Sequence, residues 1–164
     1  MDIHFTVPHR EDLEELMDIE YAGFTPDEAA TKEAMLERIE IIADSFIVAR
    51  DSRDKILGYV VGPVIPQRYI TDELFEHTIP NPPSGGFQSI LSLAVHPHHR
   101  GKGIAVKLLN ELEKMCVRYQ RQGITLTCLD HLVPFYEASG YCNEGESASE
   151  HAGKVWFNLV KSLK

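Results

Sequence analysis

The stretch between Ser89 and Leu109 constrains this chain most, because it reads as a strand, a glycine turn and the start of a helix. The first amides of a helix have no partner inside the helix, and the helix dipole places partial positive charge there. The turn Arg100-Gly-Lys-Gly-Ile-Ala105 removes side chains at two positions beside those amides and adds two full positive charges. This arrangement predicts a binding site for a phosphate or a pyrophosphate.

Two common phosphate motifs do not match this turn. A P-loop requires Lys-Ser/Thr after its last glycine, whereas Gly103 is followed by Ile104 and Ala105. The dinucleotide fingerprint requires three glycines at the start of a βαβ unit, and the turn has two. What remains is the pattern Arg-x-x-Gly-x-Ala over residues 100–105, placed between a strand and a long amphipathic helix.

This pattern resembles the acetyl-CoA pyrophosphate loop of the GNAT N-acetyltransferases, which reads Gln/Arg-x-x-Gly-x-Gly/Ala. The preceding Leu93-Ala-Val-His-Pro97 and the following Leu108-Leu109 are also similar to that family. Later in the chain, Leu132-Val-Pro-Phe-Tyr-Glu137 resembles the arylalkylamine (serotonin-type) N-acetyltransferases and their bacterial relatives. The segment Glu20–Ala30 resembles the helix-loop-helix of those bacterial proteins, whose loop folds over the amine acceptor.

The resemblance implies an α/β chain with the GNAT (acyl-CoA N-acyltransferase) fold, in which a mixed, mostly antiparallel, splayed sheet is flanked by helices. The strand that carries Leu93 and Val95 is expected to part from the strand 126–129 like a V. The pantetheine arm of the cosubstrate acetyl-CoA would lie in this V and pair with backbone groups of Leu93 and Val95. The residues implied to bind acetyl-CoA are Leu93, Ala94, Val95, Arg100, Gly101, Lys102, Gly103, Ile104, Ala105 and Tyr136.

Along the chain, predicted strands alternate with predicted helices, which by itself indicates a mixed α/β sheet. The expected strands cover residues 3–7, 46–49, 56–64, 87–95, 124–129 and 154–160, with another that starts at residue 141. A first helix opens at residues 8–12, a second is capped by Thr25 or Asp27 and ends near residue 43, and two more cover 102–120 and 133–138. Residues 66–86 form a long connection with a short helix at 72–76, and such connections are more often functional than idle.

Length and composition place the chain among ordinary globular proteins. At 164 residues we expect one domain, residues 1–164, with one core. The net charge of −9 argues against nucleic acid as a partner, since basic residues gather only near Arg100. Three cysteines without a Cys-x-x-Cys pair argue against disulfides and structural zinc, and favour a cytoplasmic location. No apolar run approaches the ~18 residues of a membrane span, and the first residues do not resemble a signal peptide.

Acetyl transfer to an amine requires removal of a proton, a site for the oxyanion and protonation of the departing thiolate. Tyr136 matches the tyrosine that the resemblance implies as the proton donor to the CoA sulfur. The vertebrate arylalkylamine enzymes carry two histidines at the positions of Ser89 and Leu91, so their base is missing here. The candidates for that role are a chain of waters, a water held by Ser89, and the side chains of Asp130, His131 and Glu20. We take Tyr136, Ser89 and Asp130 as the catalytic candidates.

The acceptor is expected to be a small primary amine, either an arylalkylamine or a polyamine. The candidate substrate-binding residues are Glu20, Phe24, Pro26 and Trp156. Two alternatives stay open, a protein or peptide N-acetyltransferase and a non-catalytic acetyl-CoA-binding module. No membrane partner and no metal are expected, because the histidines at 96, 98 and 99 neighbour a proline and cations rather than other ligands. A homodimer is left open.

Overall fold

The computed structural model describes residues 2–163, which form nine strands, four α-helices and six short 3₁₀ segments. In chain order the elements are β1 (His4–Thr6), η1 (Arg10–Asp12), α1 (Leu13–Gly23), α2 (Lys32–Ile41), η2 (Ala43–Ser45), β2 (Phe46–Arg50), β3 (Ile56–Val61), β4 (Val64–Ile65), η3 (Asp72–Phe75), β5 (Phe87–Ile90), β6 (Ser92–Val95), η4 (Pro97–His99), α3 (Ile104–Arg118), β7 (Gly123–Cys128), η5 (Asp130–Leu132), α4 (Val133–Ala138), β8 (Cys142–Glu146), η6 (His151–Gly153) and β9 (Phe157–Ser162).

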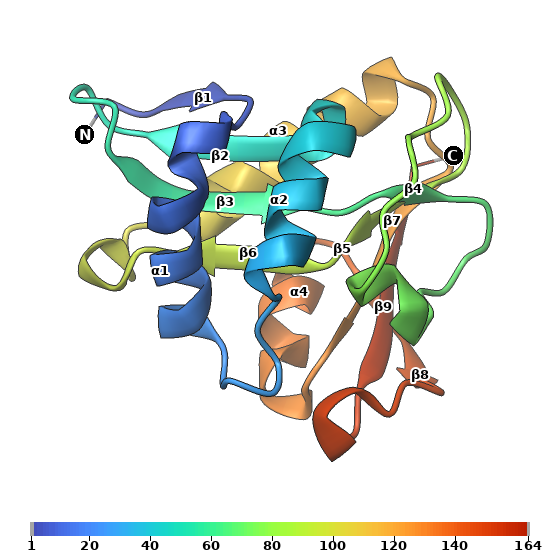
Figure 1. The fold of residues 1–164 in the computed structure, drawn as a ribbon. Coiled ribbons are helices and arrows are strands. Elements are labelled where there is room, and N and C mark those ends of the chain that lie inside the picture. Colours follow the sequence, from blue (N-terminus) through green and yellow to red (C-terminus); the bar gives the residue numbers. More distant parts are fainter. Residues whose placement is uncertain (1, 164) are drawn as a thin grey trace.

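The strands form two sheets, with the orders β1-β2-β3-β6 and β4-β5-β7-β9-β8. Neighbouring strands are antiparallel except β5 and β7, which run parallel. In Figure 1, α1 and α2 cover the near face of the first sheet and α3 lies behind it. Because β6 ends the first sheet while β7 lies inside the second, these two strands diverge. The structure thus confirms the expected mixed, mostly antiparallel, splayed sheet flanked by helices.

The two sheets separate at Leu91, within what the sequence predicts as one strand over residues 87–95. Ser92 lies opposite Val61 of β3, and the Leu91 amide also donates to the Val61 carbonyl oxygen at 2.8 Å. Two residues that face one partner residue form a β-bulge, which bends a strand and changes its pairing. The residues before Leu91 therefore pair with β4 and β7, and those after it pair with β3.

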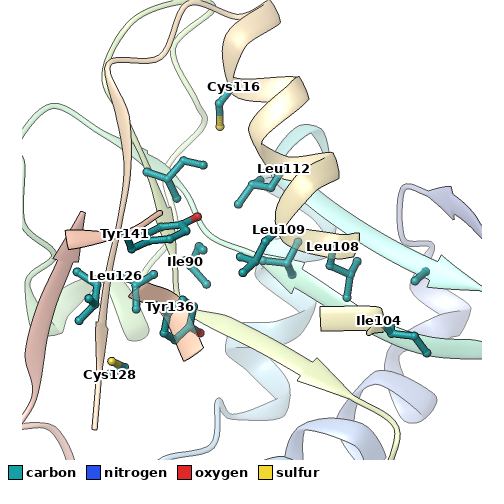
Figure 2. Close-up of a cluster of buried hydrophobic side chains, with 14 of the residues drawn as sticks. Ile90, Ile104, Leu108, Leu109, Leu112, Cys116, Leu126, Cys128, Tyr136 and Tyr141 are labelled. Carbon is teal, nitrogen blue, oxygen red and sulfur yellow. The ribbon is translucent and has the colours of Figure 1, made fainter. Parts of the chain in front are cut away.

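The apolar face of α3 packs into the main core. Its buried positions Ile104, Leu108, Leu109 and Leu112 recur at helical spacing, and each is at most 3% exposed. Figure 2 shows Leu109 and Leu112 directed toward Ile90 and Tyr141, and all four residues belong to one buried cluster that also includes Leu126 and Tyr136. A second core, under α1 and α2, contains Leu16, Met35, Phe46 and Tyr59. The divergence of β6 and β7 is therefore supported by packed side chains on both faces of the first sheet.

Two local predictions differ from the structure. Thr31 caps α2, since its hydroxyl accepts from the Ala34 amide at 3.1 Å, so the predicted caps Thr25 and Asp27 are wrong. The predicted strand 56–64 divides around Gly62, where a Cβ would lie 2.1 Å from the Ser89 carbonyl oxygen. The strand expected to start at residue 141 begins at Cys142, as β8, and runs to Glu146. No helix within residues 2–163 is long and apolar enough to cross a membrane.

Candidate functional site

The glycine turn before α3 leaves its backbone open. Gly101 and Gly103 have φ angles of +77° and +78°, and a Cβ built at either position meets no atom within 4 Å. Side chains other than glycine are strained at such angles, so the turn requires these residues. The first hydrogen bond of α3 runs from the Lys107 amide to the Gly103 carbonyl oxygen. The amides of residues 104–106 therefore have no acceptor inside the helix. This geometry fits the predicted pyrophosphate-binding site.

The two cations of this turn have different surroundings. The Arg100 guanidinium donates to the Ala22 carbonyl oxygen at 3.1 Å, near the end of α1, and to the Val95 carbonyl oxygen at 3.4 Å. Arg100 therefore ties the turn to α1 and β6. Lys102 is exposed, as are both glycines. A bound anion would meet backbone amides first and the Lys102 charge second.

One edge of β6 carries the backbone groups that the sequence predicts for a pantetheine arm. The register pairs Gly58 with Val95 and Val60 with Leu93 across β3 and β6, and the His96 amide donates to the Leu57 carbonyl oxygen at 2.8 Å. Because hydrogen-bonding direction alternates along an antiparallel strand, Leu93 and Val95 direct their backbone groups away from β3. This edge faces the gap that opens toward β7.

A narrow pocket of about 70 Å³ lies where β6 and β7 diverge. Its walls are apolar and come from both sheets, through Leu91 and Leu93 on one side and Leu126 and Cys128 on the other. Phe24, Glu28, Phe75, His151 and Trp156 also line it, and they come from three segments far apart in the sequence. We call these three segments, residues 24–31, 72–75 and 147–156, the cover.

Tyr136 projects from α4 into this pocket. The side chain is 7% exposed, and its hydroxyl makes no hydrogen bond to any described residue. Figure 2 shows it at the end of the buried cluster nearest Cys128 of β7. Burial, together with the neighbouring Cys128, raises the pKa of Tyr136, and burial raises the pKa of the Cys128 thiol to about 12. Both groups are therefore neutral near pH 7, so the Tyr136 hydroxyl keeps its proton and Cys128 is a poor nucleophile.

Direct contacts hold the parts of the cover together. The His151 ring stacks on Phe75 with centroids 4.8 Å apart and planes 7° apart, and its Nε2 lies 3.2 Å from the Glu28 carbonyl oxygen. The Lys154 ammonium donates to Glu28 Oε2 at 2.6 Å. In Figure 1 the loop between α1 and α2, the η3 turn and the turn before β9 surround the lower end of the two sheets. These contacts join the three segments of the cover at the pocket.

Glu20 lies beneath the cover rather than in the pocket wall. Its side chain is 1% exposed, and Oε2 accepts from the Ala30 amide at 2.8 Å and from the Ser92 hydroxyl at 3.2 Å. The Tyr59 hydroxyl donates to Oε1. Glu20 thus anchors the 24–31 loop to α1 and β6, and its carboxylate accepts three hydrogen bonds from residues that do not line the pocket.

The structure brings some predicted site residues together and not others. Leu93, Phe24, Trp156 and Tyr136 all line the pocket. Ser89 does not, because its hydroxyl donates to the Pro63 carbonyl oxygen at 2.6 Å and the residue is fully buried in β5.

Two further candidates lie outside the pocket, since Asp130 and Pro26 are both exposed and neither contributes to its lining. In their place the pocket contains Glu28, Phe75 and His151, which the sequence did not assign. The unusual length of the 66–86 connection indicated that a residue there, such as Phe75, could belong to the site. The resemblance of residues 20–30 to an acceptor loop indicated the same for Glu28. Nothing local marks His151, which reaches the pocket through contacts with distant segments. Within residues 2–163, no three histidine, cysteine or acidic side chains are arranged to hold a metal ion.

A family model described as the acetyltransferase (GNAT) family matches residues 11–141. Among solved structures, the loading GNATL domain of CurA from Lyngbya majuscula superposes with a TM-score of 0.82 at 14% identity, covering 99% of this chain and 98% of that one. NAA60 from Arabidopsis thaliana, in complex with a bisubstrate analogue, gives 0.75 at 18% identity, with 99% and 100% covered.

The GNAT-like decarboxylase GphF, in complex with isobutyryl-CoA, gives a TM-score of 0.77 at 16% identity, with 98% of this chain and 100% of that one covered. Likeness at these identities shows the fold alone. No curated protein sequence matches the chain significantly. None of these three structures is described as an arylalkylamine enzyme, so closeness to that branch stays a prediction.

Proposed function

We propose that this chain, which belongs to the acetyltransferase (GNAT) family, transfers the acetyl group of acetyl-CoA directly to the nitrogen of a small primary amine. One observation carries the proposal. The unpartnered hydroxyl of Tyr136 lies at an apolar pocket where β6 and β7 diverge, and the open glycine turn follows the end of β6. A donor and an acceptor would meet at this pocket.

Acetyl-CoA would lie along the backbone of residues 91–105, from the glycine turn to the pocket. Its pyrophosphate would sit on the amides at the start of α3, and its pantetheine arm would pair with Leu93 and Val95 along the free edge of β6. The thioester would then reach the pocket beside Tyr136. Recognition by backbone groups needs open space rather than particular side chains, and the absence of any atom within 4 Å of a Cβ at Gly101 or Gly103 supplies that space.

Tyr136 would protonate the departing sulfur. When the amine attacks the thioester carbon, the carbon–sulfur bond breaks and a thiolate leaves. Tyr136 lines the pocket with its hydroxyl still protonated, so a proton is available to that thiolate, and such proton transfer accounts for about 10²–10⁴-fold in rate. The transfer is direct, since the raised pKa of Cys128 leaves no thiolate nucleophile in the pocket wall.

The width of the pocket bears on the acceptor. Its volume of about 70 Å³ is well below the ~150 Å³ of an engineered cavity that holds benzene. A pocket of this size suits a slender alkylamine chain better than an aromatic ring. Of the two predicted classes, aliphatic amines and polyamines therefore agree better with the observed pocket than arylalkylamines. The closed cover also disfavours a peptide acceptor, which needs a groove of peptide width.

Release of free thiol from acetyl-CoA tests the proposal. The acceptor panel is butylamine, spermidine, tyramine, tryptamine and a lysine-containing peptide. We expect turnover with butylamine and spermidine, and slower turnover with the aromatic amines. Acetyl-CoA binding without thiol release from any acceptor would show a non-catalytic binding module, and release with the peptide alone would show a protein acetyltransferase.

Tyr136→Phe sharpens the same experiment. This variant keeps the ring and removes the proton, so we expect kcat to fall about 10²-fold or more while acetyl-CoA affinity stays close to wild type. A fall of equal size in affinity would remove Tyr136 as the proton donor. Tyr69→Phe is a matched control, because Tyr69 is an exposed tyrosine whose hydroxyl bonds Glu144, away from the pocket.

A further inference from the structure

We propose that His151 is the base that removes a proton from the acceptor ammonium, an inference that rests on the function proposed above. The sequence alone does not identify this base. In the structure the candidates Ser89 and Asp130 lie outside the pocket, and the Glu20 carboxylate is engaged in hydrogen bonds beneath the cover. His151 lines the pocket together with Tyr136, and the two come from different elements, η6 and α4. It belongs to the cover, which is the part of the site that an acceptor would contact.

The hydrogen bonding of the ring identifies which nitrogen can accept a proton. His151 Nε2 lies 3.2 Å from the Glu28 carbonyl oxygen, and a carbonyl oxygen can only accept. Nε2 must therefore carry the hydrogen of this contact. In a neutral imidazole the other nitrogen, Nδ1, then holds a free lone pair, which is what a base requires. The Glu28 carbonyl thus selects the tautomer that is ready to accept a proton at Nδ1.

Packing fixes the ring in this orientation. It stacks on Phe75 with planes 7° apart and lies 5.7 Å from the Trp156 ring. The Trp156 indole N–H donates to the His151 carbonyl oxygen at 2.8 Å, and the His151 amide donates to the Ser149 hydroxyl at 3.2 Å. A base held in place by its neighbours loses no orientational freedom when the acceptor binds.

Other ionisable groups near the ring are less suited to this role. Burial acts to raise the pKa of Glu28, but hydrogen bonds from Lys154 and the Thr25 amide lower it overall, which makes the carboxylate a weak base. Across the pocket Cys128 and Tyr136 stay protonated. On the cover side, Asp72 accepts from the Ser149 hydroxyl and the Glu150 amide. Among the side chains that line the pocket in residues 2–163, His151 alone has a free nitrogen lone pair.

The protons balance as follows. An alkylammonium gives one proton to Nδ1 of His151, and the neutral amine then attacks the thioester carbon. As the carbon–sulfur bond breaks, Tyr136 gives its proton to the sulfur and regains one from the new amide nitrogen. The His151 imidazolium returns to the neutral form by releasing its proton to water, which its partial exposure allows. The products are the acetamide, CoA thiol and one proton.

Two small acceptors of different basicity test this assignment in the full chain. Butylamine is an ammonium ion at pH 7.5 and needs a base, whereas methoxyamine is already neutral there and does not. In His151→Gln the new amide can still donate to the Glu28 carbonyl. We expect kcat/KM for butylamine to fall about 10²-fold and that for methoxyamine to change little. His77→Gln, at an exposed histidine outside the pocket, is the matched control and should leave both values unchanged.

A second variant keeps the test decisive if His151→Gln disturbs the cover. In His151→Ala, added imidazole should restore butylamine turnover in proportion to its concentration, and acetyl-CoA binding by calorimetry reports that the fold is intact. Equal losses for both amines, or no rescue by imidazole, would overturn the assignment and leave His151 as a packing residue. Wild-type protein that acetylates neither amine would refute the proposed function itself.

Discussion

The two halves of the candidate site are built in different ways. The half proposed for acetyl-CoA, called the donor half, consists of backbone groups from one continuous stretch, residues 91–105, which includes the edge of β6 and the glycine turn. The half proposed for the amine, called the acceptor half, consists of side chains from three separate segments that meet as the cover. One half therefore depends on local conformation, and the other depends on contacts between distant parts of the chain.

This difference suits two kinds of ligand. Backbone amides can recognise a pyrophosphate whatever the neighbouring side chains are. The acceptor differs between enzymes, so its site is made of side chains that substitutions can change without moving the donor site. The following substitutions act on the part that joins the two halves, on the donor half, on the acceptor half and on its periphery.

Glu20 joins the two halves, and its loss should have the largest effect. Glu20→Ala leaves the Tyr59 and Ser92 hydroxyls and the Ala30 amide without their acceptor in a buried place. We expect the free energy of unfolding to fall by about 3 kcal/mol, measured by urea denaturation. Glu14→Ala on the exposed face of the same helix should change it by less than about 0.5 kcal/mol. Similar values for the two variants would mean that the Glu20 contacts do not support the cover.

Gly103→Val tests the donor half alone. A β-branched residue at a φ of +78° costs about 1–2 kcal/mol, so we expect acetyl-CoA affinity to fall about tenfold, as measured by calorimetry. Gly85→Val is the matched control, because Gly85 has a φ of +76° and equally open surroundings but lies outside the turn. Equal affinity losses in the two variants would indicate a general loss of stability rather than a damaged anion site.

Glu28→Gln tests the acceptor half alone. It breaks the contact with Lys154, whose side chain is 34% exposed, so the loss is about 1 kcal/mol or less. We expect KM for the amine to rise up to about fivefold, with KM for acetyl-CoA unchanged. Because the pKa of Glu28 is lowered on folding, its contribution to stability is full above pH 4.5 and is lost as pH falls below that value. A rise in both KM values would mean that the two halves are not separable.

Arg68→Gln, at the periphery, should have the smallest effect. Arg68 and Tyr69 bond the Glu144 carboxylate, and these hydrogen bonds lower the pKa of Glu144 from 4.5 to about 2. We expect the pKa of Glu144, followed by NMR titration, to rise toward 4.5 in the variant. In the wild type the stability from this pair is present above pH 4.5 and is lost as pH falls toward 2. Turnover at neutral pH should not change, since the pair lies outside the pocket.

The same contrast explains what the sequence could predict. The helix 133–138, the glycine turn and Tyr136 follow from local patterns, and the structure places them as expected. The break at Leu91 depends on Val61 in a neighbouring strand, so no local pattern marks it. The contact between Glu28 and Lys154 joins residues 126 positions apart, and nothing in either segment alone predicts it. Ser89 was misplaced for a similar reason, because its hydroxyl is taken by Pro63.

The bulge at Leu91 sets the phase of the strand that follows it. Side chains and backbone groups alternate along a strand with a period of two, so a shift of one residue exchanges every inward group for an outward one. Deletion of Leu91 would turn the backbone of Leu93 and Val95 toward β3 and present Ser92 and Ala94 to the gap instead. At this point a single residue therefore decides which backbone groups of β6 face the gap.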